Sequence, residues 1–344
     1  MDKIITVIGN LGRTDKPDGQ TVRTHTVWET VKKYYGSDYS IVFIDAGGKK
    51  IAKLFLKWRL LLNSSILVIM PGPRSINLVT SLLQVLGVLE RTVHVAIGGW
   101  LPAYIENNHK LLVKEMRVHA VLVQMDSIRE KLQNMGLDNA IWFPNYRNSS
   151  RNNISIKAPN ANPYKFVFYS RIIQEKGAFV AIEAIKKLTD EGNDVQLDLY
   201  GPIDDTVKQE LEKETAGYNN INYRRVLFGK EILETLSQYD CMLFPTCYRG
   251  EGFPGAVLES MMAGVPVIAT DWKYNSEIVK DGETGIICGP QSVENVYDAI
   301  QRVRGDLALY RRICDGAYRE AEKYSEETVT PVLKKVIDEI KDKS

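Results

Sequence analysis

Residues 244–289 hold the densest group of residues that can do chemistry. An apolar run ends at Phe244, a glycine-containing loop covers residues 249–255, and a helical pattern begins near Ala256. Backbone N–H groups at a helix N-terminus lack partners within the helix, and the positive end of the helix dipole lies there, so this loop can hold a diphosphate. We expect the loop residues themselves to bind such a ligand: Gly252, Phe253, Pro254 and Gly255.

Two glutamates flank this loop, Glu251 and Glu259. We expect Glu259 to lie on the inner side of the helix, where its carboxylate can accept two hydrogen bonds from a ribose diol. We expect Glu251 to be exposed on the loop and to reach sugar hydroxyls. Two acids at this spacing, taken alone, fit equally a capped helix with two solvated carboxylates.

The sequence around the two glutamates contains further motifs in a fixed order. After Glu259 come Ala-Gly-Val-Pro-Val at 263–267, Glu-Ile at 277–278 and Asp-Gly-Glu-Thr-Gly at 281–285. Over about forty residues this order resembles the C-terminal domain of the large retaining glycosyltransferase family 4 (group 1), which has the GT-B fold. The resemblance implies a nucleotide-sugar donor and an α/β fold of two Rossmann-like domains with parallel sheets facing a central cleft.

A second match to this family lies upstream, where Tyr-Ser-Arg-Ile-Ile-Gln-Glu-Lys-Gly occupies residues 169–177. It is similar to the family's Gly-Arg-Leu-x-x-Glu-Lys-Gly, with Ser170 in place of the first glycine. The resemblance places Arg171 and Lys176 on the donor diphosphate and makes them, with Glu251, the catalytic residues. Fixed cations there would stabilise the negative charge that grows as the diphosphate leaves.

The N-terminal half offers weaker candidates. A glycine loop after the first apolar run resembles the family's N-terminal loop, which approaches the donor, and we assign Gly19, Gln20 and Thr21 to it; a plain turn is the alternative. Trp100 and Tyr104 can form an acceptor-binding wall or belong to the core. His94 lies within a predicted strand and fits a core histidine better than a ligand contact.

The elements that must position these residues follow from alternating patterns. Short β-branched runs alternate with amphipathic stretches, which predicts parallel sheets covered by helices. The Asn-, Ser- and Pro-rich residues 143–163 interrupt this alternation and form the expected linker. We therefore assign residues 1–150 to an acceptor domain and residues 160–324 to a donor domain, and expect a C-terminal helix, residues 325–344, to pack back on the first.

Charge and composition limit the function classes. The net charge of +1 gives no global field for nucleic acid. Residues 1–150 carry 19 basic and 12 acidic residues, a local excess of +7, which suits an anionic surface or acceptor. Four scattered cysteines suit reduced thiols, and the first ten residues lack a signal-peptide pattern, so we expect a cytoplasmic protein.

Residues 49–62 combine Lys and Arg with bulky apolar side chains at near-helical spacing. Such a helix can lie in an anionic membrane interface, which would make the protein peripheral on the inner face of the cell membrane. A core helix with a solvated basic face explains the pattern equally well.

These features predict an enzyme that transfers a sugar from a nucleotide diphosphate sugar, UDP-sugar being preferred, to a glycan or a lipid-linked oligosaccharide in polysaccharide biosynthesis. By resemblance the transfer retains configuration and needs no metal or other cofactor, and the chain contains no Asp-x-Asp metal motif. A sugar-nucleotide epimerase or a phosphorylase on the same fold remains an alternative. A catalytically silent subunit that binds the sugar nucleotide is another.

Overall fold

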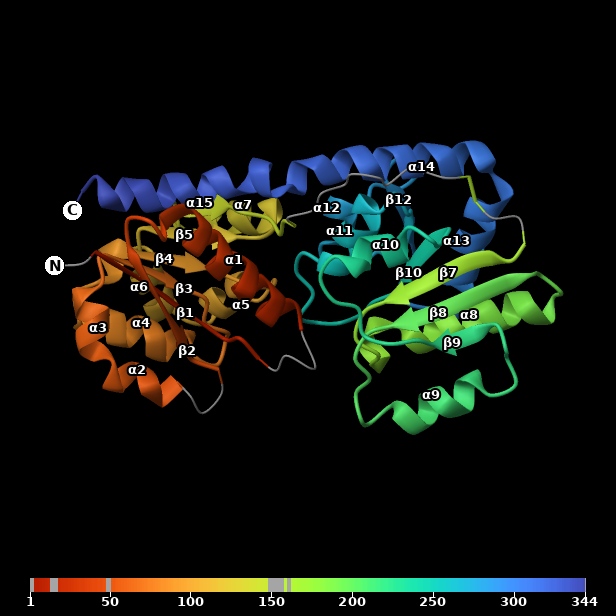
Figure 1. Cartoon of the computed structure of the whole chain (residues 1–344), viewed down its shortest axis with the longest axis horizontal. Coiled ribbons are helices and arrows are strands. Elements are labelled where there is room, and N and C mark those ends of the chain that lie inside the picture. Colours follow the sequence, from red (N-terminus) through yellow and green to blue (C-terminus); the bar gives the residue numbers. More distant parts are fainter. Residues whose placement is uncertain (1–2, 13–17, 48–50, 148–157, 160–161, 344) are drawn as a thin grey trace. The chain divides into compact units, whose positions relative to one another are not determined.

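The computed structural model describes residues 3–12, 18–47, 51–147, 158–159 and 162–343. The chain divides into two compact units, the first made of residues 1–145 and 327–344 and the second of residues 146–326. Each unit holds one six-stranded sheet in which all neighbouring strands are parallel (Figure 1).

The first unit has the strand order β2-β1-β3-β4-β5-β6. Its strands are β1 (Ile4–Gly9), β2 (Ser40–Asp45), β3 (Ile66–Ile69), β4 (Thr92–Val95), β5 (Ala120–Val123) and β6 (Ala140–Trp142). Its helices are α1 (Gly19–Tyr35), α2 (Lys53–Leu56), α3 (Trp58–Asn63), α4 (Ile76–Val85), η2 (Leu89–Arg91), α5 (Leu101–Glu106), α6 (His109–Glu115), α7 (Asp126–Asn134) and α15 (Glu326–Lys341). Strands β3, β4 and β5 are buried along their whole length, as expected for a parallel sheet covered on both faces.

The second unit repeats this plan with the order β12-β11-β10-β7-β8-β9. Its strands are β7 (Tyr164–Tyr169), β8 (Val195–Tyr200), β9 (Ile221–Tyr223), β10 (Cys241–Phe244), β11 (Val267–Thr270) and β12 (Gly285–Cys288). Its helices are η3 (Gln174–Lys176), α8 (Ala178–Asp190), α9 (Lys208–Thr215), α10 (Glu231–Leu236), α11 (Gly255–Met262), α12 (Asn275–Ile278), α13 (Val293–Gly305), α14 (Leu307–Glu320) and η4 (Ala321–Tyr324).

The prediction of one continuous helix through residues 49–62 is wrong. Lys49 and Lys50 lie outside the described residues, and the remainder forms the two short helices α2 and α3. The break falls at Lys57, whose backbone has φ −102° and ψ 19°. The buried side chains Leu54 and Leu61 anchor the two helices to the core, so tertiary packing rather than a continuous apolar stripe determines their course.

The cysteines of the second unit are unpaired thiols. Cys241, Cys288 and Cys314 are buried, whereas Cys247 is partly exposed. Burial raises the pKa of the Cys288 thiol to about 11 and that of the Cys314 thiol to about 12. These two side chains are therefore neutral, unreactive core residues at ordinary pH.

Candidate active site

The chain reverses direction across the second sheet between β7 and β10. From β7 the strands proceed to β8 and β9 on one side, and the later strands β10, β11 and β12 lie on the other. Ligands of open parallel sheets bind at such a switch point, beyond the carboxyl ends of the strands. The loops that leave β7 and β10 here are residues 170–177 and 245–254. They contain six of the predicted site residues: Arg171, Lys176, Glu251, Gly252, Phe253 and Pro254.

An ion pair joins these two loops. Lys176 Nζ lies 2.7 Å from Glu251 Oε2 and 3.0 Å from Glu251 Oε1. The Thr246 hydroxyl donates a further hydrogen bond of 3.0 Å to Glu251 Oε2. Lys176 and Glu251 are only 8% and 5% exposed. The expectation that Glu251 is exposed is therefore wrong: its loop packs against the loop after β7, where the Cys247 N–H donates to the Glu175 carbonyl, and the buried carboxylate is stabilised by the lysine.

The ring of Tyr248 brings the second predicted cation to the same place. The Arg171 guanidinium lies 5.1 Å from the ring centroid and Lys176 Nζ lies 4.9 Å from it. The Tyr248 carbonyl accepts a hydrogen bond of 2.8 Å from Trp272 Nε1, which ties the loop after β11 to the loop after β10. Two cations are thus held on one aromatic platform at the switch point.

Helix α11 begins beside this platform. Its N-cap, Pro254, makes no side-chain capping hydrogen bond, so the first-turn N–H groups are not satisfied by a cap side chain. Phe253 is 5% exposed and packs edge-on against Tyr324 at 4.9 Å between centroids. Gly252 is buried and Gly255 is half-buried. Phe253 thus anchors the loop, while the helix end supplies donors suited to an anion.

Glu259 is engaged by residues that the sequence analysis did not identify. Its Oε1 atom lies 2.6 Å from Arg147 Nε. Burial, together with a hydrogen bond to Glu259, raises the pKa of Tyr169 well above its ordinary value. The Arg147 guanidinium passes close to Gly255 at the start of α11, where a Cβ atom would require this flexible side chain to shift. Arg147 stands in a stretch composed like a linker, and no spacing rule links it to Glu259.

Two further basic residues near the site are exposed: Arg249 in the loop after β10 and Lys273 in the loop after β11. Lys273 has a φ of 53°, the one positive φ among the described residues other than glycine. Such a conformation is costly for a long side chain and marks a constrained loop.

The candidates of the first unit lie after β1 and β4. Gly19 and Gln20 begin α1, and Thr21 forms a capping box with Asp18. The Thr21 hydroxyl accepts from the Asp18 N–H at 3.0 Å and donates to the Asp18 carbonyl, so it has a local structural function. Gln20 is half-buried.

Trp100 and Tyr104 contact each other edge-on at 5.7 Å between ring centroids. Both polar tips are engaged, since Trp100 Nε1 donates to the Ile97 carbonyl and the Tyr104 hydroxyl accepts from Asn77. His94 is fully buried in β4, with Nδ1 2.8 Å from Glu115 Oε2, as expected for a core histidine.

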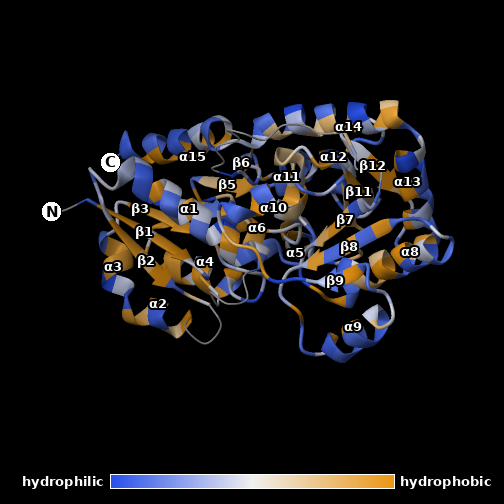
Figure 2. Ribbon diagram, turned by 45° about the vertical axis from the view of Figure 1, so that its right-hand side comes forward, coloured by the Kyte–Doolittle hydropathy of each residue, from blue (hydrophilic) through white to orange (hydrophobic). Residues whose placement is uncertain are grey.

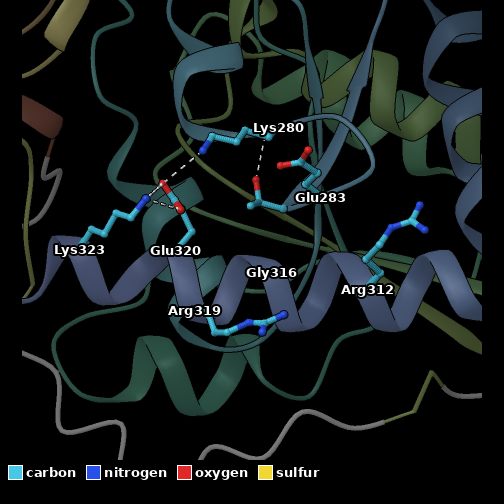
Figure 3. Close-up of a pocket in the computed structure, with 8 residues that line it drawn as sticks. Lys280, Glu283, Arg312, Gly316, Arg319, Glu320 and Lys323 are labelled. Carbon is cyan, nitrogen blue, oxygen red and sulfur yellow. Dashed lines mark hydrogen bonds and ion pairs between the residues drawn. The ribbon is translucent and has the colours of Figure 1, made fainter.

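A concavity of about 380 Å³ in the second unit lies between the loop before β12 and helix α14. Its lining is Lys280, Glu283, Thr284, Arg312, Gly316, Arg319, Glu320 and Lys323, none of which is a predicted site residue. Figure 3 shows Lys280 and Lys323 both directed at Glu320, 3.9 and 2.8 Å away. The concavity lies away from the carboxyl ends of β7 and β10, where ligands of open parallel sheets bind, so the switch point is the stronger candidate.

Among the residues that the structure describes, no three His, Cys, Asp or Glu side chains come together in a way that could hold a metal ion. The charged groups near the switch point are Lys176, Arg171, Arg147 and the two glutamates. This set can bind a diphosphate through its cations and hydroxyl groups through its carboxylates.

Comparison with known proteins connects these loops to a family. The family described as glycosyl transferases group 1 matches residues 149–319. The alpha-D-kanosaminyltransferase of Streptomyces kanamyceticus is 30% identical over 46% of this chain and 41% of its own length. The poly(glycerol-phosphate) alpha-glucosyltransferase of Bacillus subtilis is 26% identical over 47% of this chain and 24% of its own. The chain thus spans less than half the length of these relatives.

Two solved structures resemble the whole chain. HepE of Anabaena, in complex with UDP and glucose, superposes with a TM-score of 0.74 at 14% identity, covering 98% of this chain and all of HepE. The sucrose-phosphate synthase of Thermosynechococcus elongatus gives 0.75 at 15% identity, covering 99% of this chain and all of the synthase. These likenesses confirm the GT-B fold. Through the sequence of its second unit, the chain belongs to the glycosyl transferases group 1 family.

Proposed function

We propose that this chain transfers a sugar from a nucleotide diphosphate sugar to a hydroxyl group of an acceptor, with retention of configuration and without a metal ion. The observation that carries the proposal is the convergence of Arg171, Lys176 and the N-terminus of α11 at the switch point of the second sheet. Both cations and the first-turn amides stand where a diphosphate can be bound.

The arrangement can assist departure of the diphosphate. As the bond between the anomeric carbon and the diphosphate oxygen breaks, the bonding electrons pass to that oxygen. Arg171, Lys176 and the α11 amides would stabilise this negative charge in the transition state more strongly than they stabilise the ground state. In a retaining transfer the acceptor hydroxyl attacks from the face that the diphosphate leaves, and a diphosphate oxygen takes the hydroxyl proton.

The two glutamates have separate tasks in this proposal. Glu251 holds Lys176 in place through both carboxylate oxygens and presents its remaining lone pairs to sugar hydroxyls. Glu259, oriented by Arg147 and Tyr169, accepts hydrogen bonds from the ribose diol. In the other unit, Gly19, Gln20 and Thr21 remain our proposal for further donor contacts, and Trp100 and Tyr104 for the acceptor.

The proposed substrates draw on proteins of similar fold. HepE, the TarM protein of S. aureus and the pneumococcal GtfA have all been solved with UDP, which supports a UDP-sugar donor. The B. subtilis relative is named for poly(glycerol phosphate). This name supports a polymeric acceptor. A glycan or lipid-linked oligosaccharide acceptor in polysaccharide biosynthesis and a cytoplasmic site of action remain part of our proposal.

Thermal unfolding with nucleotides tests the proposal. The melting temperature would be measured with UDP, GDP, ADP and dTDP and their sugar conjugates, each with and without a chelator. A ligand at about 100 times its Kd stabilises the folded state by about 2.7 kcal/mol, so we expect a clear upward shift with UDP and UDP-sugars. Product analysis of the best donor with glycan acceptors would then report transfer and anomeric configuration.

The results that contradict the proposal are specific. A shift that disappears with the chelator would refute metal independence. Conversion of the sugar nucleotide without any acceptor would indicate an epimerase. Donor binding with neither transfer nor hydrolysis across a broad acceptor panel would indicate a binding subunit.

A further inference from the structure

Exposed apolar side chains gather on three helices of the first unit. The described residues include twelve large apolar side chains that are exposed, and six of them fall within residues 55–85, where an even spread would place about one. They are Phe55, Leu56, Trp58, Leu62, Leu78 and Val85. Leu56 and Val85 are each 84% exposed. We call the outer surface of α2, α3 and α4 the docking face.

The three helices cover one side of the sheet. The steps from β2 to β3 and from β3 to β4 run in the same direction across it, so right-handed crossovers place α2, α3 and α4 on the same face. Figures 1 and 2 both show these helices as neighbours, and α2 carries a conspicuous orange, apolar segment in Figure 2. Leu54, Leu61 and Leu83 already fill the inner side, so the outward apolar groups are not needed for the core.

Residues 46–89, which include α2, α3 and α4, carry basic but no acidic side chains. Asp and Glu make up 43 of the 344 residues, yet none occurs between Asp45 and Glu90. The same stretch contains six basic residues, Lys49, Lys50, Lys53, Lys57, Arg59 and Arg74. Lys53, Lys57 and Arg59 are exposed beside the apolar groups, and the Arg59 guanidinium lies 5.3 Å from the Trp58 ring centroid.

We propose that the docking face binds the surface of an anionic lipid bilayer. Exposed Leu, Phe and Trp side chains can enter the headgroup boundary while neighbouring Lys and Arg contact anionic lipids. A second copy of the chain is a poor occupant, because two faces that lack acidic residues would repel each other. No helix within the described ranges has the length and apolarity to cross a bilayer, so the contact is one of surface binding.

Vesicle co-sedimentation of the full chain tests this inference. The vesicles are phosphatidylcholine alone, or phosphatidylcholine and phosphatidylglycerol in equal parts. We expect binding to the anionic vesicles only, and weaker binding as salt is raised. Neutralising the three exposed cations, K53Q/K57Q/R59Q, should weaken binding about 100-fold. Replacing the exposed apolar pair, L56S/W58S, should weaken it at least about tenfold.

Matched controls come from the second unit. K208Q/K213Q/K230Q removes the same number of exposed positive charges, and F228S removes an apolar side chain that is 49% exposed. Both controls should bind anionic vesicles like the wild type. The melting temperature and its shift with UDP should be unchanged in all four variants, which separates loss of membrane binding from misfolding or loss of donor binding.

Three results would overturn the inference. The first is absence of wild-type binding to anionic vesicles, and the second is equal weakening by the face variants and their controls. The third is a concentration-dependent dimer, abolished by L56S/W58S, in a protein that does not sediment with vesicles. That result would assign the face to self-association.

Discussion

At the scale of single residues, two ion pairs in the second unit couple stability to the proposed chemistry. Lys176–Glu251 and Arg147–Glu259 each hold a largely buried glutamate next to a cation, at 2.7 and 2.6 Å. Removing one partner of a buried pair leaves an uncompensated charge and costs about 3–5 kcal/mol. Substitutions here therefore affect folding as well as catalysis. Each needs a control variant that lowers stability to a similar extent but does not alter the proposed site.

Lys186 provides such a control for Lys176. Its Nζ atom pairs with Glu183 and Glu214 at 2.7 and 2.6 Å, and its side chain is 13% exposed, against 10% for Lys176. We expect K176M and K186M both to lower the melting temperature. Only K176M should abolish the shift with UDP and reduce kcat about 100-fold or more, as loss of a group that stabilises the leaving charge does.

Equal retention of UDP binding by K176M and K186M would remove Lys176 from the diphosphate site.

E251Q, which keeps the shape of the side chain, should bind UDP but lose both stability and transfer, because Lys176 would lose its carboxylate partner. Wild-type transfer in folded E251Q would exclude Glu251 from the reaction.

Arg147 allows a prediction about sugar recognition. If Arg147 orients Glu259 toward the ribose diol, R147M should bind UDP more weakly and should lose much of the wild-type preference for UDP over 2′-deoxy-UDP. We expect that preference to fall about tenfold, since a hydrogen bond to a charged group contributes about 1.5–3 kcal/mol. Titration calorimetry with both nucleotides measures it. An unchanged preference in R147M would make Arg147 a purely structural partner.

At the scale of elements, backbone geometry brings the loops after β7 and β10 together. Gly177 ends η3 and precedes α8 with a φ of +83°. A Cβ atom at this position would lie 2.1 Å from the Pro245 carbonyl oxygen. Glycine thus permits both the turn and the close approach of the two loops that carry Lys176 and Glu251.

Gly192 separates the cost of the left-handed turn from the cost of the close approach. It has the same φ of +83°, but nothing lies within 4 Å of its Cβ position. G192A should cost about 1–2 kcal/mol, the strain of a left-handed residue. G177A should cost clearly more, since the Pro245 backbone must also shift, and should weaken UDP binding. Denaturant unfolding gives both values. Equal costs would mean that the contact with Pro245 relaxes freely.

At the scale of the whole molecule, the chain leaves the first unit at residue 145 and returns to it at residue 327. Helix α15 belongs to the first unit by contact, since the Tyr35 hydroxyl donates to Asp338 at 2.9 Å and His119 lies 3.2 Å from Glu339. Its side chains Leu333 and Ile337 are 1% and 0% exposed. The end of the sequence therefore stabilises its beginning.

This arrangement predicts a stability effect confined to one unit. I337A should lower the free energy of opening, as measured by hydrogen exchange, by about 2–5 kcal/mol throughout residues 3–145. That is the usual cost of such a core truncation. The free energy of opening in residues 162–326 should not change, and UDP should still raise the melting temperature of that unit. L307A, at an exposed position, serves as the control. Loss of protection in both units would show that the chain unfolds as one cooperative body.

The sequence by itself determined the class of the fold and the location of the motif-bearing loops. Strand and helix periods are local, so the alternating pattern predicted two parallel α/β sheets, and both the fold and the group 1 family are confirmed. The motifs at residues 169–177 and 251–285 follow strand ends for the same reason. The functions assigned to Arg171, Lys176, Glu251 and Glu259 stay predictions.

Only the tertiary structure decided which side chains meet. Lys176 and Glu251 are 75 residues apart and Arg147 and Glu259 are 112 residues apart, so no periodicity connects them. The burial of Glu251 and the break at Lys57 also depend on what packs against them. Local propensity selects an element, whereas the partners of a charged side chain depend on long-range packing that residue spacing does not encode.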